Sequence, residues 1–303
     1  MDKTVRDYKN LLDPSFISKL NSLELKARLV VEGFMVGFHK SPYHGFSVEF
    51  SEHRAYMQGD NLKDVDWKVF GKTEKYYIKQ YEEETNLRSY IFLDTSNSMS
   101  YNSGNNISKL DYSLTLAAAL SYLMIHQQDA VSLTLYSEKI NKFLPPKSSR
   151  AYLQEILKNL ASVEASAKTN TAASLNEAAE KIKRRGLVVI ISDFFDDINF
   201  VLKALKHFSY NKNEVIVFQV LDPIEKTFSF GKDAIFKDLE TGDEMTTQPY
   251  QIQKAYREAM GEFINRIKKE CLNSNIDYNL IETSDPYDKA LLRYIQKPAW
   301  TRA

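Results

Sequence analysis

The chain has 303 residues, of which 43% are hydrophobic, so it is long enough to bury a substantial core as one large domain or two smaller ones. Lysine plus arginine and aspartate plus glutamate both number 40, so the formal charge is zero and the basic excess typical of nucleic-acid-binding proteins is absent. The single cysteine, Cys271, excludes a disulfide framework and a thiolate metal site, and no two histidines have the spacing of a helical zinc site.

Targeting signals and membrane segments are also missing from the sequence pattern. The first ten residues are charged and lack the apolar core of a signal peptide. No run of about 18 apolar residues occurs, so no membrane span is predicted. We therefore expect a cytoplasmic protein that has no membrane span and binds no nucleic acid.

Residues 1–85 differ in pattern from the rest and are predicted to form a smaller α+β region. Residues 25–38 have the apolar content of a helix. Three aromatic and β-branched segments have the composition of strands, namely 46–50, 53–57 and 76–81. The segment also contains an acidic and aromatic group that comprises Arg54, Asp60, Asp64, Asp66 and Trp67. We interpret it as a network that joins this region to the main domain, with a second functional site as the alternative.

Residues 86–303 alternate between short apolar runs and helical patterns, which predicts parallel βαβ units. Four runs are nearly continuous in apolar residues, as in a sheet covered on both faces: 90–93, 130–136, 187–191 and 215–221. A more polar run at 276–281 is predicted to be an edge strand. The helical patterns lie at 109–126, 150–161, 175–183 and 251–272, and the Gly242 turn predicts a hairpin within 227–249. The predicted fold class is therefore α/β, an open, mostly parallel sheet with helices on both faces.

The motif whose side chains are candidate ligands is Asp94-Thr95-Ser96-Asn97-Ser98, directly after the first strand. Its spacing puts a carboxylate and two hydroxyls on one short loop, and Mg²⁺ prefers six oxygen ligands at about 2.1 Å. Further oxygens come from Thr169 or Thr171, before a helix, and from Asp193, after the third strand. Ligands bind at the carboxyl ends of strands in such sheets, so these groups are expected at one edge. On its own the motif is also typical of a turn or a helix cap.

Taken together, Asp94, Ser96, Ser98, Thr169 and Asp193 resemble the metal-ion-dependent adhesion site of von Willebrand factor A domains. The family pattern is D-x-S-x-S, then T-N-T-G, then an aspartate; Ala172 stands here in place of the glycine. The resemblance implies a von Willebrand factor A-like, Rossmann-like fold. It also implies that Thr169, which the spacing alone does not separate from Thr171, is the ligand.

A longer resemblance is to the bacterial family called domain of unknown function 58, over roughly residues 15 to 295. It rests on five segments in the right order: 50–60, 64–67, 81–84, 184–187 and 238–242. Members are often encoded beside MoxR-type AAA+ ATPases, which implies such a partner. Many carry N-terminal membrane helices, so this chain resembles the soluble subgroup.

The resulting hypothesis is a non-enzymatic module that binds Mg²⁺, or Mn²⁺ or Ca²⁺, and uses it to hold a carboxylate of a protein partner. One alternative is a haloacid-dehalogenase-like phosphatase with Asp94 as nucleophile, although Ser96 stands where such enzymes need a second aspartate. The other is a structural scaffold with an empty metal site. The sequence has no phosphate-binding glycine loop, and no residue is predicted to be catalytic.

Overall fold

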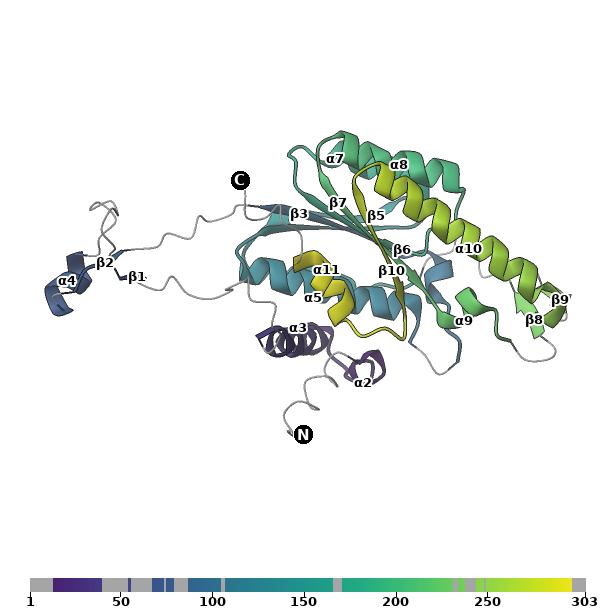
Figure 1. Ribbon diagram of the computed structural model, residues 1–303, viewed down its shortest axis with the longest axis horizontal. Coiled ribbons are helices and arrows are strands. Elements are labelled where there is room, and N and C mark those ends of the chain that lie inside the picture. The colour runs from purple at the N-terminus through teal and green to yellow at the C-terminus, as the bar shows by residue number, and fades with distance from the viewer. Residues whose placement is uncertain are drawn as a thin grey trace. The chain divides into compact units, whose positions relative to one another are not determined.

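The computed structural model describes residues 13–39, 54–55, 67–73, 75–78, 87–104, 107–165, 171–230, 234–237, 244–247 and 249–295. Its main feature is a six-stranded sheet in the order β10-β7-β6-β3-β4-β5, parallel except for β5 (Figure 1). The strands are β3 (Arg88–Asp94), β4 (Ala130–Tyr136), β5 (Ile140–Lys147), β6 (Leu187–Ser192), β7 (Glu214–Leu221) and β10 (Ile276–Glu282). The predicted fold class is confirmed, and β10 is an edge strand as expected.

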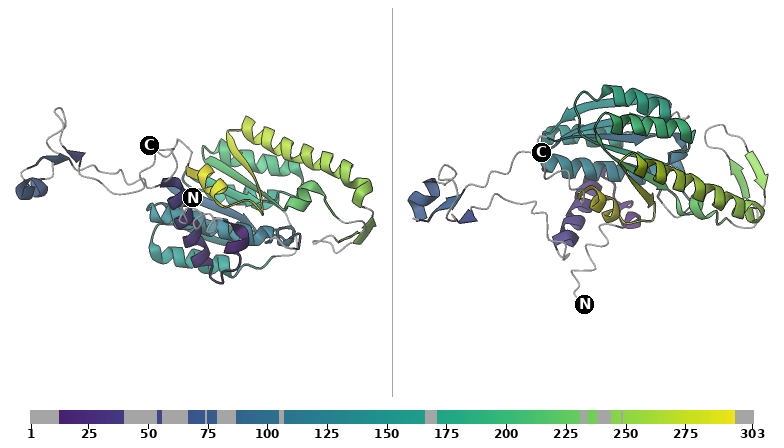
Figure 2. Two further views of the ribbon diagram at one scale, coloured as in Figure 1. Left: turned by 60° about the horizontal axis from the view of Figure 1, so that its bottom comes forward. Right: turned by 45° about the horizontal axis from the view of Figure 1, so that its top comes forward.

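Helices cover both faces of this sheet (Figures 1 and 2). One layer contains α7 (Thr171–Lys181), α8 (Ile198–Tyr210) and α10 (Pro249–Asn273). The other contains α5 (Lys109–His126), α6 (Arg150–Ala161), α11 (Asp288–Ile295) and α3 (Leu23–His39). Tyr90 and Phe92 of β3 pack in a core cluster with residues of α7 and α8, so the alternate residues Ile91 and Leu93 face α5. This double cover explains why the central strands are apolar on both sides.

Strand β5 is an element that the sequence analysis did not predict. It runs antiparallel to β4 at the edge of the sheet and contains Pro145 and Pro146. Proline is tolerated in an edge strand or at a bulge, and the pairing of β5 with β4 shifts register between Val131 and Leu133, opposite the two prolines. The burial of β5 is low, with only Leu144 buried, so its sequence lacks an apolar run.

The chain divides differently from the expected boundary at residue 85. Residues 1–40 belong with 86–303 in one compact unit, and 41–85 form the other. The physical reason is that α3 packs on α5 and places Ala27, Val30 and Phe34 in the core. Because α3 covers its outer side, α5 is buried almost all round rather than along one face. The short α2 (Pro14–Ile17) precedes α3.

The second unit contains β1 (Arg54–Ala55), α4 (Trp67–Thr73) and β2 (Tyr77–Ile78), with β1 and β2 antiparallel. The predicted strand at 46–50 and the residues Asp60, Asp64 and Asp66 lie outside the described residues. In the large unit, α9 (Pro223–Thr227) follows β7, and β8 (Ala234–Lys237) pairs antiparallel with β9 (Glu244–Thr247). The hairpin predicted within 227–249 is therefore confirmed.

Asp129, in the turn between α5 and β4, is a buried carboxyl far along the chain from the predicted site. It is 3% exposed, its Oδ1 has no hydrogen-bond partner among the described residues, and burial raises its pKa to about 7. A folded-state pKa above the ordinary value means that the stabilisation by its protonated form is fully present below about pH 4. That stabilisation is lost as the pH rises through about 7.

We expect Asp129→Asn to raise the free energy of unfolding at pH 8 by on the order of 2 kcal/mol and to leave it nearly unchanged at pH 4. Urea unfolding followed by circular dichroism at both pH values measures the difference. Equal stability of the variant and the parent at pH 8 would contradict the assignment of a buried, charged Asp129.

Candidate metal centre

The predicted site residues that the structure describes lie at the carboxyl ends of β3 and β6. These two strands are neighbours, and the chain leaves them in opposite directions, from β3 to α5 on one face and from β6 to α8 on the other. The sheet order reverses at this point, which is where open α/β sheets bind ligands. Asp94 ends β3, and Asp193 directly follows β6.

The loop after β3 turns tightly back on itself. Asp94 Oδ1 accepts a hydrogen bond from Ser96 N at 2.9 Å, and the Ser96 and Ser98 hydroxyls lie 3.1 Å apart. Residues Asn97–Ser100 form a short 3-10 helix, anchored by the fully buried Met99. The structure therefore brings the carboxylate and the two predicted hydroxyls together, with Ser98 only half-buried at the rim.

A second set of contacts fixes the carboxylates. Ser192 Oγ donates to Asp94 Oδ2 at 2.6 Å and so links the two loops. Phe195 N donates to Asp193 Oδ1 at 3.1 Å, and Gln219 Nε2 donates to the Asp193 carbonyl at 3.0 Å. Phe194, which lies between Asp193 and Phe195 in the sequence, has a φ of 61°, and its side chain packs in the core.

The electrostatics of Asp94 are unfavourable without a bound cation. Asp94 and Asp193 are both 0% exposed. Burial raises the pKa of Asp94 to about 6, and the neighbouring Asp193 carboxylate adds to the rise. Tyr136 lies close enough that Asp94 adds to the effect of burial in raising the pKa of its phenol. Among the described residues, Asp94 pairs with no cationic side chain, so a divalent cation fits the chemistry of this donor set.

Thr169, the fifth predicted ligand, lies outside the described residues, as does the side chain of Thr171. Helix α7 begins directly afterwards, and Ala172 N donates to Asp196 Oδ2 at 3.4 Å. The start of α7 is thus held against the loop after β6. Asp197 caps α8 by accepting from Asn199 N, and Cys271 is buried.

Two charged residues that the sequence analysis did not single out belong to this site. Lys109, the first residue of α5, is fully buried, and its Nζ lies 2.8 Å from Asp193 Oδ2 and 2.7 Å from Glu225 Oε1. Burial lowers the pKa of Lys109, but Asp193 and Glu225 raise it by more, so the net shift is upward and the amine stays charged. A positive charge at a helix N-terminus is unfavourable for the helix dipole. This unusual position is the sequence feature that could have drawn attention to Lys109. Glu225 appears in sequence as part of an Asp-Pro-Ile-Glu capping box.

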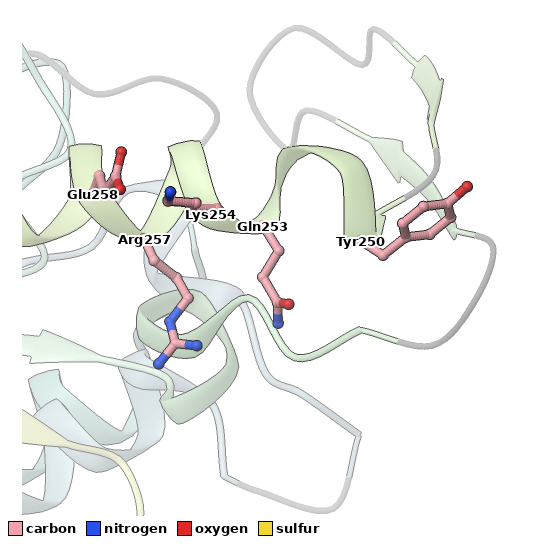
Figure 3. Close-up of a pocket in the computed structure, with 5 residues that line it drawn as sticks. All are labelled: Tyr250, Gln253, Lys254, Arg257 and Glu258. Carbon is pink, nitrogen blue, oxygen red and sulfur yellow. The ribbon is translucent and has the colours of Figure 1, made fainter.

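Over the described ranges, no three histidine, cysteine, aspartate or glutamate side chains form a set that could hold a metal ion by themselves. Binding at the β3–β6 edge would therefore depend on the serine hydroxyls. A hollow of about 340 Å³ also lies on α10, lined by Tyr250, Gln253, Lys254, Arg257 and Glu258. Figure 3 shows that these side chains point in different directions, Tyr250 away from the others and Arg257 toward α9, so they do not converge on a ligand.

The sheet order, the helices on both faces and the Asp-Ser-Ser loop at the switch point define a von Willebrand factor A-like α/β protein. The family described as protein of unknown function DUF58 matches residues 52–266. This chain belongs to that family.

Relatives and solved structures are similar to this chain over most of its length. An uncharacterised protein of Mycobacterium tuberculosis is 25% identical over 251 residues, which cover 81% of this chain and 77% of that protein. The crystal structure of an aerotolerance-related membrane protein from Bacteroides fragilis is 23% identical, with a TM-score of 0.48, over 69% of this chain and 98% of that one. The von Willebrand factor A domain of SpRpn10 is 10% identical, with a TM-score of 0.41, over 71% and 96%. Within the described residues of the present chain, no helix combines the length and apolarity needed to cross a membrane.

Proposed function

We propose that this chain is a non-enzymatic binding module that holds one divalent cation, Mg²⁺ in the first instance and Mn²⁺ or Ca²⁺ as alternatives. Its ligands are Asp94, Ser96, Ser98 and Asp193, with Thr169 from the segment outside the described residues. The observation that carries the proposal is a pair of fully buried carboxylates beside two adjoining serine hydroxyls, with no cationic partner on Asp94 in the part of the chain that the structure describes. Buried charge of this kind needs a counter-ion.

The ion would serve as a bridge to a protein partner. Neutral hydroxyl ligands leave a bound cation electrophilic, which favours an incoming carboxylate. The half-buried Ser98 lies on the solvent side of the site, where such a group would arrive. A hollow of about 320 Å³ adjoins the loop and offers a place for a partner segment; it is lined by Thr95, Leu135, Asn141, Lys142, Asn159, Ser162, Val163 and Glu164. We propose a MoxR-type AAA+ ATPase as the partner, which the family resemblance implies.

The phosphatase alternative has less support. Ser96 stands two residues after Asp94, where such an enzyme needs a second aspartate as general acid, and a serine hydroxyl cannot take that role at neutral pH. In the scaffold alternative no metal binds, and the charge of Asp94 stays uncompensated. Titration of the chain with Mg²⁺ or Mn²⁺ distinguishes this alternative from the proposal.

We expect Ser98→Ala to raise the dissociation constant for Mg²⁺ or Mn²⁺ at least tenfold, because it removes a direct oxygen ligand. Ser100→Ala is the matched control: it removes a hydroxyl two residues away that donates to Asn97 O at 2.6 Å, and its binding should stay within twofold of the parent. Titration calorimetry measures both. Equal affinity of the parent and Ser98→Ala would argue against the site.

The same two variants test the partner. Affinity capture with and without a chelator should recover a chelator-sensitive ATPase with the parent and with Ser100→Ala. Ser98→Ala should lose it. If the ATPase is recovered regardless of the chelator and of the Ser98→Ala substitution, the ion is not part of the interface.

A further inference from the structure

Lys109 places a positive charge where the proposed metal ion would need a carboxylate oxygen. The ammonium has no solvent exposure and contacts two acids, Asp193 at 2.8 Å and Glu225 at 2.7 Å. The Phe195 ring lies 4.7 Å from Nζ and adds a cation–π contact on another side. A charge buried this deeply is held by its partners, so its position is well determined.

The two oxygens of Asp193 are already engaged. Oδ1 accepts from Phe195 N, and Oδ2 accepts from Lys109. A cation that approaches Asp193 meets the ammonium on the same carboxylate, and like charges in a buried site repel strongly. The ammonium and the ion therefore compete for Asp193.

Glu225 gives the ammonium a second acceptor that does not move with the metal loop. Its Oε2 accepts from Asp222 N at 3.0 Å within the capping box of α9, which fixes the side chain. Within the set of Lys109, Glu225, Asp94 and Asp193, Lys109 cancels Glu225, and the two charges left on Asp94 and Asp193 match one divalent cation. Glu225 thus draws the ammonium away from Asp193 and favours the ion.

We propose that Lys109 is a built-in competitor of the metal ion, shared between Asp193 and Glu225, and that this sharing sets a weak, reversible metal affinity. The inference rests on the proposed function, since it concerns the same ion. Lys109 is a positioning residue here, because it acts through Asp193. When the ion binds, the ammonium pairs with Glu225 alone; when the ion leaves, it returns to Asp193.

The test is Mn²⁺ titration calorimetry on the full chain with two variants of opposite expected sign. Lys109→Met keeps the length of the side chain and removes the competitor, so the dissociation constant should fall at least tenfold. Glu225→Gln keeps a capping oxygen but weakens the second acceptor, so the dissociation constant should rise at least fivefold. Lys226→Met is the matched control: this neighbouring lysine pairs with Glu282 at 2.7 Å, and its removal should change binding less than twofold.

A purely structural role for the ion pair would shift both variants the same way, toward weaker binding, and would overturn the inference while the metal site stands. Unchanged affinity in both variants would overturn it as well. If Lys109→Met does not fold by circular dichroism, Lys109→Gln takes its place, because its neutral amide can still donate to both acids. Tighter binding then supports competition, and unchanged or weaker binding overturns it. Absence of Mn²⁺ binding by the parent chain would instead sink the proposed function, and the competition with it.

Discussion

Gly186→Ala is expected to lower the free energy of unfolding by at least about 3 kcal/mol. A Cβ at Gly186 would lie 2.1 Å from Arg88 O and 3.0 Å from the Arg88 carbonyl carbon and the Tyr90 ring. Gly186 directly precedes β6, the strand that pairs with β3, so the clash is with the backbone of a neighbouring central strand. Backbone in the middle of a sheet moves only by breaking the strand pairing on either side.

Hydrogen bonds fix both the N–H and the carbonyl of Gly186, so its backbone cannot shift to relieve the clash. Gly186 N donates to Asn213 Oδ1 at 3.0 Å, and its carbonyl accepts from Glu214 N at 3.1 Å. Gly261 is the matched control because it lies within α10 with nothing within 4 Å of the added Cβ. Gly261→Ala should stabilise the protein by about 0.5–1 kcal/mol through helix propensity. Urea unfolding of both variants decides, and an equal loss in the two would show that crowding at Gly186 is not the cause.

The strands of the central sheet could be predicted because a strand that is buried on both faces consists largely of apolar residues. The runs at β4, β6 and β7 begin and end within one residue of the observed strands. The exposed edge strand β5 has no such run, since only Leu144 is buried, and hydrophobic pattern alone does not detect it. The place of α3 was equally hidden, because an amphipathic helix near the N-terminus does not show which surface it covers.

Part of the site was predictable for a different reason. Asp94 and Asp193 follow neighbouring strands, so the topology of a parallel sheet brings them to one edge. Lys109 lies 84 positions before Asp193 in the sequence, at the start of an apolar helix, and its side chain donates to Asp193. The position of Lys109 at a helix N-terminus is unusual, but no local pattern identifies its partner, because the contact exists only once α5 lies against the sheet. Tertiary packing, rather than spacing, creates the ion pair.

Asp94→Asn should change stability in opposite ways with and without metal. In EDTA at pH 8 the parent carries a charged, fully buried Asp94 beside Asp193, and burial has raised its pKa to about 6. The amide removes that charge, while its oxygen still accepts from Ser96 N and its nitrogen can donate to Ser192 Oγ. We expect the variant to be more stable than the parent by about 2 kcal/mol under these conditions.

With Mg²⁺ at 100 times its dissociation constant, the parent should gain about 2.7 kcal/mol, and the Asp94→Asn variant should gain almost nothing. The difference between the two proteins then closes or reverses. Asp129→Asn separates the causes, because it also removes a buried carboxyl with a raised pKa but lies outside the candidate site. It should be stabilised in both buffers and keep the full Mg²⁺ response. If Asp94→Asn keeps that response too, the ion binds elsewhere, because a ligand that stabilises only the folded state must lose its effect when its site is removed.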